Sequence, residues 1–247
     1  MMQIKQNDGP VPLTVLRQLA KQNRHHRHKN YETDIRLADG QILRKFSVFK
    51  GVMRPEVMTS KFLAQYLFFH NGLYRGKDVL DIGCGSGIQG IVMGLNGAEK
   101  VVFADIDKCA VENANENMVK FKIGQKSNAV QSDLFEAISG KFDIIVFNHP
   151  YFAYPKAATF ETAHTMVQPA SLIHRFFEEV KAHLKDGGRI VMSYYHLAGP
   201  GNDPAVQAPP HSYAIADHFR MNAKTGLQRG EMSIYQLRLT ETRKLDA

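Results

Sequence analysis

A run of regularly spaced glycines and acids marks residues 77–107 as a candidate ligand-binding unit. Its spaced residues are Asp81, Gly83, Gly85, Gly87 and Asp105. An apolar strand before the glycines, a helix after them and a second strand ending in the last acid form the half-Rossmann arrangement that grips a nucleoside. Glycines let the main chain approach a ligand closely, and a carboxylate at a strand end can bind both hydroxyls of a ribose.

Two cofactor classes fit such a unit. The stretch Gly85–Gly90 reads G-x-G-x-x-G, and Asp105 follows about 20 residues on, which is the pattern of NAD-binding proteins. Asp81 argues against NAD, because a carboxylate two residues before the first glycine would repel a pyrophosphate. The same carboxylate suits a cation, and S-adenosylmethionine carries a sulfonium, an ammonium and no phosphate. We therefore expect S-adenosylmethionine.

The motif D-x-G-x-G-x-G at Asp81–Gly87 resembles the first motif of class I S-adenosylmethionine-dependent methyltransferases. The resemblance covers residues 51–240 and implies a Rossmann-like α/β fold, a mainly parallel seven-stranded sheet with helices on both faces. It also implies that the acid near the end of the strand Val130–Phe135, Asp133, accepts from the adenine amine, although Asp133 could instead cap the next helix. The implied cofactor-binding residues are Asp81, Gly83, Cys84, Gly85, Gly87, Asp105, Ile106, Asp133, Leu134 and Asn148.

A second candidate site is the tetrad Asn148-His149-Pro150-Tyr151, which follows the buried strand Phe142–Phe147. It resembles the [N/D/S]-P-P-[Y/F/W] motif of methyltransferases that act on planar nitrogens. The lone pair of an amide or aniline-type nitrogen is delocalised, so the nitrogen is a poor nucleophile. The Asn148 oxygen and a nearby main-chain carbonyl could hold its two hydrogens and aim it at the methyl group, while Tyr151 packs on the flat face of the substrate.

His149 departs from the motif, which has proline at this position. Because the residue before Pro150 is still held in an extended conformation, its carbonyl could point the same way. The imidazole adds a candidate base or substrate contact that proline could not supply. The tetrad as a whole, Asn148 to Tyr151, is the candidate catalytic site.

The elements that would position these sites follow from apolar patterning. We expect helices over 61–69 (capped by Thr59-Ser60), 88–95, 108–122, 170–184 and 214–220, and further strands over 189–194 and 232–239, the last antiparallel. Residues 152–168 are long enough to form a substrate lid, and 199–210 reads as a loop.

The first 50 residues form a basic extension ahead of a methyltransferase domain over 51–247. They hold ten Lys or Arg against four Asp or Glu, and so supply most of the net charge of +7. We expect a short helix over 13–22, the basic cluster Arg24–Lys29, and a hairpin of strands 33–38 and 41–49 that turns at Asp39-Gly40. Such an extension could bind RNA or serve as a solvated arm. The three histidines of the cluster do not have the spacing of metal ligands.

The hairpin exit resembles that of the release-factor glutamine methyltransferases, whose F-x-V-like strand leads to an R-P-E-T-E-like turn. Phe46, Val48 and Arg54-Pro55-Glu56 match this pattern, and Val57-Met58-Thr59 departs from it. The resemblance points to acceptors such as a glutamine side chain.

These features predict an S-adenosylmethionine-dependent N-methyltransferase acting on a planar amide or exocyclic amine of a macromolecule, either a protein glutamine or an RNA base. The alternatives are methylation of a small molecule and a non-catalytic RNA-binding module. No metal is expected. Two cysteines, no apolar run of membrane-spanning length and no signal-peptide pattern predict a cytoplasmic protein.

Overall fold

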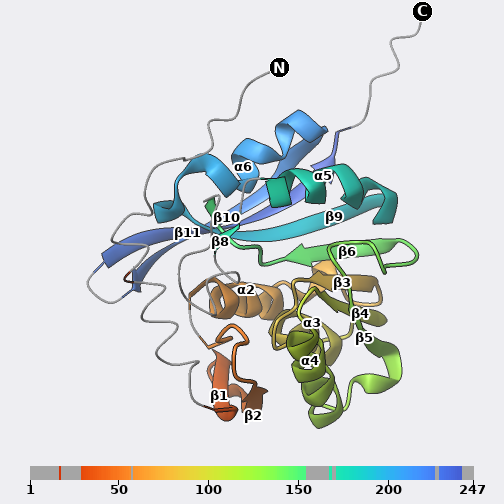
Figure 1. The fold of residues 1–247 in the computed structure, drawn as a ribbon, viewed down its shortest axis with the longest axis vertical. Coiled ribbons are helices and arrows are strands. Elements are labelled where there is room, and N and C mark those ends of the chain that lie inside the picture. Colours follow the sequence, from red (N-terminus) through yellow and green to blue (C-terminus); the bar gives the residue numbers. More distant parts are fainter. Residues whose placement is uncertain are drawn as a thin grey trace, which may run out of the picture.

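A computed structural model describes Arg17 and residues 29–56, 58–153, 167–168, 171–225 and 228–240. Its centre is a seven-stranded sheet with the strand order β10-β11-β9-β6-β3-β4-β5 (Figure 1). The strands are β3 (Asp78–Ile82), β4 (Lys100–Asp105), β5 (Ser127–Gln131), β6 (Phe142–Phe147), β9 (Leu184–Tyr195), β10 (Tyr213–Thr225) and β11 (Gln228–Leu239). The first five run parallel, and β11 pairs antiparallel with both β9 and β10. The predicted α/β architecture is confirmed.

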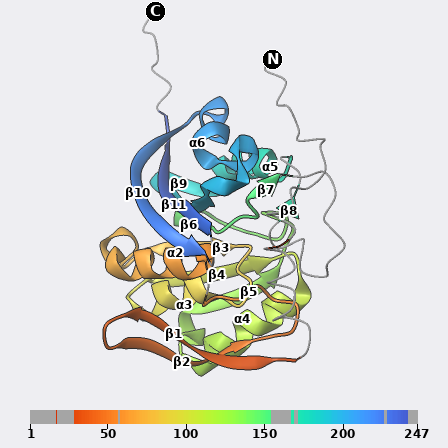
Figure 2. The ribbon, with the colours of Figure 1, turned by 90° about the vertical axis from the view of Figure 1, so that its left-hand side faces the viewer.

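The central strands are mostly apolar, as expected where both faces of a parallel sheet are covered. Every residue of β3 after Asp78 is buried, and all of β6 except Asp143 is buried. The longer helices are α2 (Met58–Phe69), α3 (Ile88–Leu95), α4 (Lys108–Lys120) and α5 (Ser171–His183). Helices α2, α3 and α4 lie towards the hairpin end of the molecule and α5 towards the other end, with strands of the sheet between them (Figures 1 and 2).

Short elements complete the described chain. They are η1 (Asn71–Leu73), η2 (Gly124–Lys126), η4 (His196–Ala198), η5 (Pro200–Asn202), α6 (Pro204–Gln207), η6 (Pro209–His211) and the two-residue strands β7 (Phe152–Ala153) and β8 (Val167–Gln168). In the described part of the chain, no helix has the length and apolar content to cross a bilayer. The helix expected over 13–22 (apart from Arg17), the basic cluster up to His28 and most of the segment 152–168 lie outside the described residues.

One expectation about the C-terminal region was wrong. Residues 214–220 were expected to be helical, but they belong to strand β10, which pairs with β11 from Tyr213↔Leu239 to Thr225↔Gln228. The apolar spacing of Ala214, Ile215 and Phe219 fits a helix locally, but pairing with β11 supplies more main-chain hydrogen bonds than one short helix could. Tertiary context therefore overrides the local pattern.

Three boundaries also need correction. Thr59 and Ser60 lie inside the first turn of α2, which begins at Met58, rather than before it as caps. Strand β5 ends at Gln131, and Ser132–Phe135 turn away from it. The expected loop 199–210 contains η5, α6 and most of η6, because its prolines suit the first positions of short helices and Asp203 caps α6 by accepting from the Ala205 amide at 2.9 Å.

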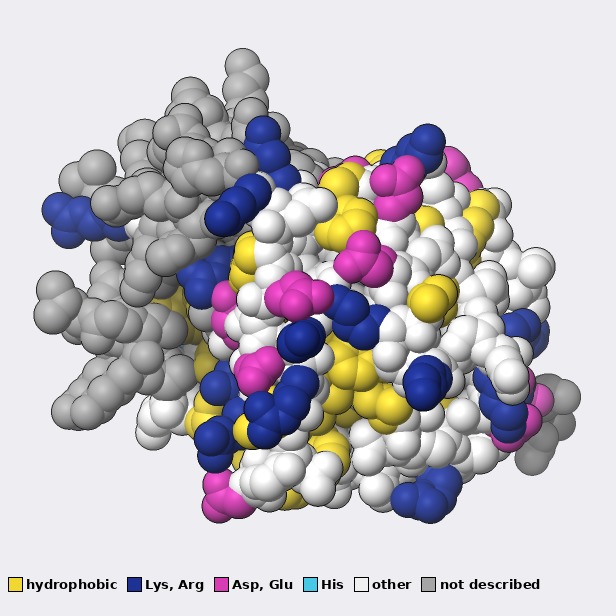
Figure 3. All heavy atoms as spheres, turned by 90° about the horizontal axis from the view of Figure 1, so that it is seen from below, with side chains coloured by type: hydrophobic (Ala, Val, Ile, Leu, Met, Phe, Trp, Pro, Cys, Tyr) yellow, Lys and Arg dark blue, Asp and Glu magenta, His cyan; other side chains and the backbone are white. Residues whose placement is uncertain are grey.

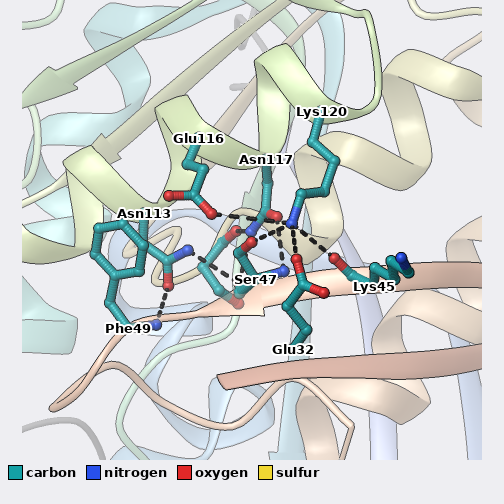
Figure 4. Close-up of polar contacts among 9 residues, drawn as sticks. Glu32, Lys45, Ser47, Phe49, Asn113, Glu116, Asn117 and Lys120 are labelled. Carbon is teal, nitrogen blue, oxygen red and sulfur yellow. Dashed lines mark hydrogen bonds and ion pairs between the residues drawn. The ribbon is translucent and has the colours of Figure 1, made fainter. Parts of the chain in front are cut away.

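The β1–β2 hairpin (Tyr31–Ala38 and Gln41–Val48) packs against α4 through buried asparagines (Figure 4). Asn117 accepts from the Ser47 amide at 3.0 Å and donates to the Ser47 carbonyl at 2.8 Å, as a neighbouring strand would. The same amide group donates to the carbonyl of Ser86 in the glycine turn at 2.9 Å. Asn113 adds bonds to Ser47 and Phe49. These bonds fix the hairpin relative to the glycine turn.

The hairpin also shares the apolar core of the sheet, since Ile35, Phe46 and Val48 belong to the same buried cluster as the central strands. The expected division at residue 50 stays a prediction. Lys120 of α4 ties the hairpin further through Glu32 at 2.7 Å, the Lys45 carbonyl at 2.8 Å and the Ser47 hydroxyl. The described end of the basic extension is thus packed on the domain.

Charge on this end of the molecule is mixed. Viewed from below, basic and acidic side chains lie next to each other (Figure 3), and Arg44 pairs with Asp34 at 3.2 Å. Residues 31–50 hold four Lys or Arg and three Asp or Glu, whereas residues 1–30 hold six Lys or Arg and one Asp. The positive charge of the extension is therefore concentrated ahead of the hairpin.

Candidate active site

A cavity of about 280 Å³ lies at the carboxyl ends of β3, β4 and β6. This edge of a parallel sheet is where ligands bind in open α/β folds. The cavity brings together the two motifs that lie 61 to 70 residues apart in sequence. Of the predicted residues, those on its wall are Gly83, Cys84, Gly85, Asp105, Ile106, Asp133, Leu134, Asn148, His149, Pro150 and Tyr151.

The glycines of the turn and of the first turn of α3 serve two different purposes. Gly85 has a φ of +54°, a conformation that costs other residues energy, and its amide donates to the Asp105 carboxylate at 2.8 Å. Gly90 lies where α3 crosses β4, and a Cβ atom there would come within 2.1 Å of the Phe103 ring. The turn thus brings bare main chain to the cavity, while Gly87 lies behind it at the start of α3.

Asp81 occupies a different place from the one expected. It is 1% exposed, lies beneath α3 and accepts from the Gly90 amide at 2.9 Å, and it is not among the residues on the cavity wall. Burial raises its pKa to about 7, and the neighbouring Asp105 adds to the rise. Asp81 therefore supports the first turn of the helix, and of the two acids only Asp105 lies on the cavity wall.

Asp105 is held at the end of β4 by two main-chain amides. Its Oδ2 accepts from Gly85 at 2.8 Å and its Oδ1 accepts from Asp107 at 3.0 Å. Each carboxylate oxygen accepts more than one hydrogen bond, so ribose hydroxyls can still reach it. The half-exposed Asp105 side chain is thus preorganised towards the cavity.

The next acid, Asp133, pairs with a residue that no sequence motif indicated. Arg175 of α5 approaches its Oδ2 at 3.1 Å and also lines the cavity. Ile106 and Leu134 complete this part of the wall, and Leu134 has a φ of +48° in the turn after β5. The position of Asp133 fits the predicted adenine contact, but the ion pair means that a ligand would share this carboxylate with Arg175.

The residues present fit a cationic nucleoside. The acids on the wall are Asp105, Asp107 and Asp133, and Arg175 is the one Lys or Arg among the described residues that line it. Burial lowers the pKa of His149 to about 4, so this histidine is neutral at neutral pH. Such a wall disfavours a diphosphate and suits a sulfonium with an ammonium. Among the described residues, no cluster of His, Cys, Asp and Glu could hold a metal ion.

Asn148 enters the cavity directly after β6 and is held from both sides by serine hydroxyls. Its Nδ2 donates to Ser60 Oγ at 2.9 Å, and its Oδ1 accepts from Ser193 Oγ at 2.5 Å. Ser60 comes from the first turn of α2 and Ser193 from β9. An amide oxygen accepts two hydrogen bonds, so the Asn148 oxygen can take a substrate hydrogen as well.

The other members of the tetrad are buried. Tyr151 is 2% exposed, its hydroxyl lies 3.8 Å from Met58 Sδ, and its ring meets Tyr195 edge-on with centroids 5.8 Å apart. His149 is also 2% exposed, and its Nε2 lies 2.7 Å from the main-chain oxygen of Asn202. Both residues are nevertheless on the cavity wall. The predicted contact of Tyr151 with a substrate stays a prediction.

Sequence reasoning missed a large part of the wall. The wall residues that it did not assign to the site include Val52, Met53, Thr59, Ser60, Gln89, Leu172 and Arg175, although Thr59 and Ser60 were expected to cap a helix. The match at Arg54-Pro55-Glu56 could have directed attention to the segment before α2, where Arg54 pairs with Glu56 at 2.7 Å. Arg175 gives no signal in the sequence, because an arginine on an amphipathic helix is ordinarily a solvated residue.

The chain is similar in sequence to curated methyltransferases. A protein of Methanocaldococcus jannaschii, provisionally named a protein N5-glutamine methyltransferase, is 33% identical over 130 residues, which is 51% of this chain and 65% of that protein. The ribosomal protein L11 methyltransferase of Thermosipho africanus is 41% identical over 98 residues, or 40% of this chain and 35% of that protein. The chain thus spans less than two thirds of the length of these curated relatives.

The fold recurs in solved structures. The 16S rRNA N2 G1207 methyltransferase of T. thermophilus, solved with AdoMet and guanosine, superposes with a TM-score of 0.60 at 20% identity, over 87% of this chain and 51% of that one. The model of the methyltransferase small domain family matches residues 57–199, more than half of the chain. The chain therefore belongs to the methyltransferase small domain family, whose fold is that of the class I S-adenosylmethionine-dependent methyltransferases.

Proposed function

We propose that the protein transfers the methyl group of S-adenosylmethionine to a planar nitrogen of a macromolecule. The observation that carries this proposal is the placement of Asn148 on the wall of the cavity that Gly85 and Asp105 also line. A nucleoside-binding turn and a nitrogen-holding amide in one cavity are what such a transfer needs. The presence of both features also argues against a non-catalytic binding module.

The cofactor would be held by the protein's own groups at one end of the cavity. The glycine turn and Asp105 would bind its ribose and amino acid parts, and Asp133 with Leu134 and Ile106 would border the adenine. When bound, the cofactor supplies an electrophilic methyl group on a sulfonium. The acids of the wall favour that positive charge, and Arg175 keeps Asp133 in place.

At the other end, Asn148 would position the acceptor. Its oxygen takes one hydrogen of the acceptor nitrogen, and a main-chain carbonyl of the tetrad takes the other. Both hydrogens are then held in the plane of the amide or base, so the nitrogen lone pair is directed at the methyl carbon for in-line displacement. The hydroxyls of Ser60 and Ser193 keep the Asn148 carboxamide from turning away.

The proposed acceptor is a protein glutamine or an RNA base. The relatives are named for a glutamine N5 atom, for ribosomal protein L11 and for the N2 atom of a guanine in 16S rRNA, and all of these acceptors belong to macromolecules. We further propose that the basic extension ahead of the hairpin contacts RNA when the acceptor carries it, and that the protein acts in the cytoplasm, as its two free thiols suggest.

A labelling experiment tests the function. Cell extract, fractionated into protein, RNA and small molecules, is incubated with the enzyme and methyl-labelled cofactor, and mass spectrometry locates the label. We expect an N-methyl group in the protein or RNA fraction, which Asn148→Ala does not produce. Label confined to small molecules would overturn the macromolecular acceptor, and label on oxygen or carbon would overturn the nitrogen assignment.

A further inference from the structure

His149, which stands where the resembled motif has proline, makes a bond that proline cannot make. Its Nε2 lies 2.7 Å from the main-chain oxygen of Asn202, which is 53 residues further along the chain. Burial lowers the pKa of His149 to about 4, so the ring carries a single proton at neutral pH. A carbonyl oxygen only accepts, and the proton must therefore be on Nε2, which donates to Asn202.

Asn202 returns a bond to the tetrad. Its Nδ2 donates to the main-chain oxygen of Pro150 at 3.1 Å and to that of Gln168 at 3.4 Å, and the residue is 1% exposed. The side chain of His149 thus holds the main chain at Asn202, and the side chain of Asn202 holds the main chain at Pro150. One bond is donated by His149 and the other by Asn202, and together they join two segments that lie far apart in the sequence.

The segment that carries Asn202, residues 199–207, is itself firmly anchored, and we call it the strap. A Cβ atom at Gly201 would come within 2.5 Å of the Ala153 Cβ, so the strap passes close behind the tetrad. Gln207 donates to the Gly201 carbonyl at 3.0 Å. Tyr194 donates to the Gly199 carbonyl, and its ring lies parallel to the His149 ring at 5.9 Å. The strap is therefore a fixed support.

We infer that His149 and Asn202 are positioning residues that hold the main chain beside Asn148 in the geometry for methyl transfer. In the resembled motif, proline restricts this main chain through its ring. Here the two bonds to the strap supply the restriction instead. The inference rests on the proposed function, because the geometry that it explains is that of the acceptor nitrogen. A displacement of about 1 Å at such a place can lower turnover by about a hundredfold.

The first test measures turnover and cofactor affinity separately in His149→Pro, His149→Ala, His149→Gln and Asn202→Ala. His149→Ala removes the donor to the strap and supplies no ring in its place, so we expect turnover to fall on the order of tenfold while S-adenosylhomocysteine affinity changes less than about twofold. His149→Pro should retain more turnover than His149→Ala, because the proline ring restricts the same main chain. The amide of a glutamine side chain can donate to the Asn202 carbonyl, so His149→Gln should retain more turnover than His149→Ala. Full activity in folded His149→Ala would overturn the inference.

Two further measurements separate positioning from general stability. His70→Ala is the matched control, because His70 also bonds a main-chain carbonyl (Tyr66, 2.8 Å), but at the end of α2 and outside the cavity wall. We expect it to leave turnover unchanged. In the double variant His149→Ala/Asn202→Ala, turnover should fall less than the product of the single losses, because both residues serve one linkage. Fully multiplicative losses would show that the two act separately and would overturn the linkage.

A spectroscopic test needs no activity. Nitrogen–proton correlation spectra of wild-type histidines should show His149 as the neutral Nε2–H tautomer at pH 6, where a free imidazole is largely protonated. A Nδ1–H tautomer, or a protonated ring at that pH, would overturn the bond to the strap. If the wild type methylates no nitrogen at all, the proposed function fails, whereas this spectrum still decides whether the linkage exists.

Discussion

The two ends of the cavity are built in different ways. At the cofactor end, the two carboxylates that bond the glycine-turn unit are close to it in sequence: Asp81 and Gly90 are nine residues apart, and Asp105 and Gly85 are twenty apart. At the acceptor end, Asn148 is held by Ser60 and Ser193, which lie 88 and 45 residues away. One end is a local motif, and the other is assembled from the whole domain.

This contrast has a functional consequence. A local unit can bind the same nucleoside in many proteins, whereas long-range contacts can be changed one at a time to suit a new acceptor. Changes at the cofactor end should therefore appear as altered affinity, and changes at the acceptor end as altered turnover. The predictions below test that separation, beginning with the largest effect.

Asn148→Ala should lower turnover by on the order of a hundredfold or more, because it removes the acceptor that holds the substrate nitrogen. Cofactor affinity should stay nearly unchanged, since Asp105 and the glycine turn are untouched. Single-turnover kinetics and calorimetry with S-adenosylhomocysteine measure the two effects. Asn96→Ala is the control, because it removes an amide that bonds the Val92 carbonyl at the end of α3. An equal loss of affinity in Asn148→Ala would break the separation.

Asp105→Ala should weaken S-adenosylhomocysteine binding by about 1.5–3 kcal/mol through loss of charge-assisted hydrogen bonds. Turnover at saturating cofactor should change far less. Calorimetry measures the affinity, with Asp143→Ala as the control, because Asp143 pairs with Lys185 at 2.8 Å near the opposite end of β6. Wild-type protein should show no detectable NAD binding. Tight binding of NAD would contradict the assignment of this end of the cavity.

Asp81→Asn should make the protein increasingly stable relative to the wild type as pH rises. The folded wild type keeps the Asp81 proton up to a pKa of about 7, whereas the unfolded chain releases it near 3.8. Between these values, rising pH favours the unfolded wild type by about 1.4 kcal/mol per pH unit, and Asn cannot titrate.

Denaturant titrations of wild type and Asp81→Asn from pH 4 to 8 check this expectation. The difference in unfolding free energy should grow up to about pH 7 and then level off. Asn can still accept from the Gly90 amide, so cofactor affinity should be retained. A pH-independent difference would show that the Asp81 carboxyl is not protonated in the folded protein.

Substitutions in the basic cluster should have the smallest effect on the two ends of the cavity. Replacing Arg24, Arg27 and Lys29 by Ala should leave cofactor affinity unchanged. If the acceptor carries RNA, a plot of the logarithm of the RNA-binding constant against the logarithm of salt concentration should become less steep by about two to three. The reason is that each phosphate that the variant no longer contacts keeps its counterion on binding. Filter binding at several salt concentrations measures the slope. An unchanged slope, together with full turnover after deletion of residues 1–30, would show that the cluster belongs to a solvated arm that does not contact RNA.

The sequence by itself determined the glycine turn and Asp105 at the cofactor end, and the parallel core. Strand β3, the glycine turn, helix α3 and the acid at the end of β4 are consecutive, and each is favoured by its own residues: apolar runs for the strands, glycines for the turn. Local propensity and tertiary structure agree there, so the positions of Gly85, Asp105 and the helix Ile88–Leu95 could be predicted. The strand before Asn148 was predictable for the same reason.

Only the tertiary structure decided the rest. Residues 214–220 form a strand because β11 offers a partner, and Asp81 lies under α3 because the first turn of that helix needs an acceptor. Ser60, Ser193 and Asn202 meet the motif residues across 45 to 88 positions of sequence, and at the cofactor end Arg175 meets Asp133 across 42 positions. Such contacts depend on how strands and helices pack, and packing places side chains together without leaving a fixed spacing in the chain. The acceptor end of the cavity is for that reason visible only in the folded protein.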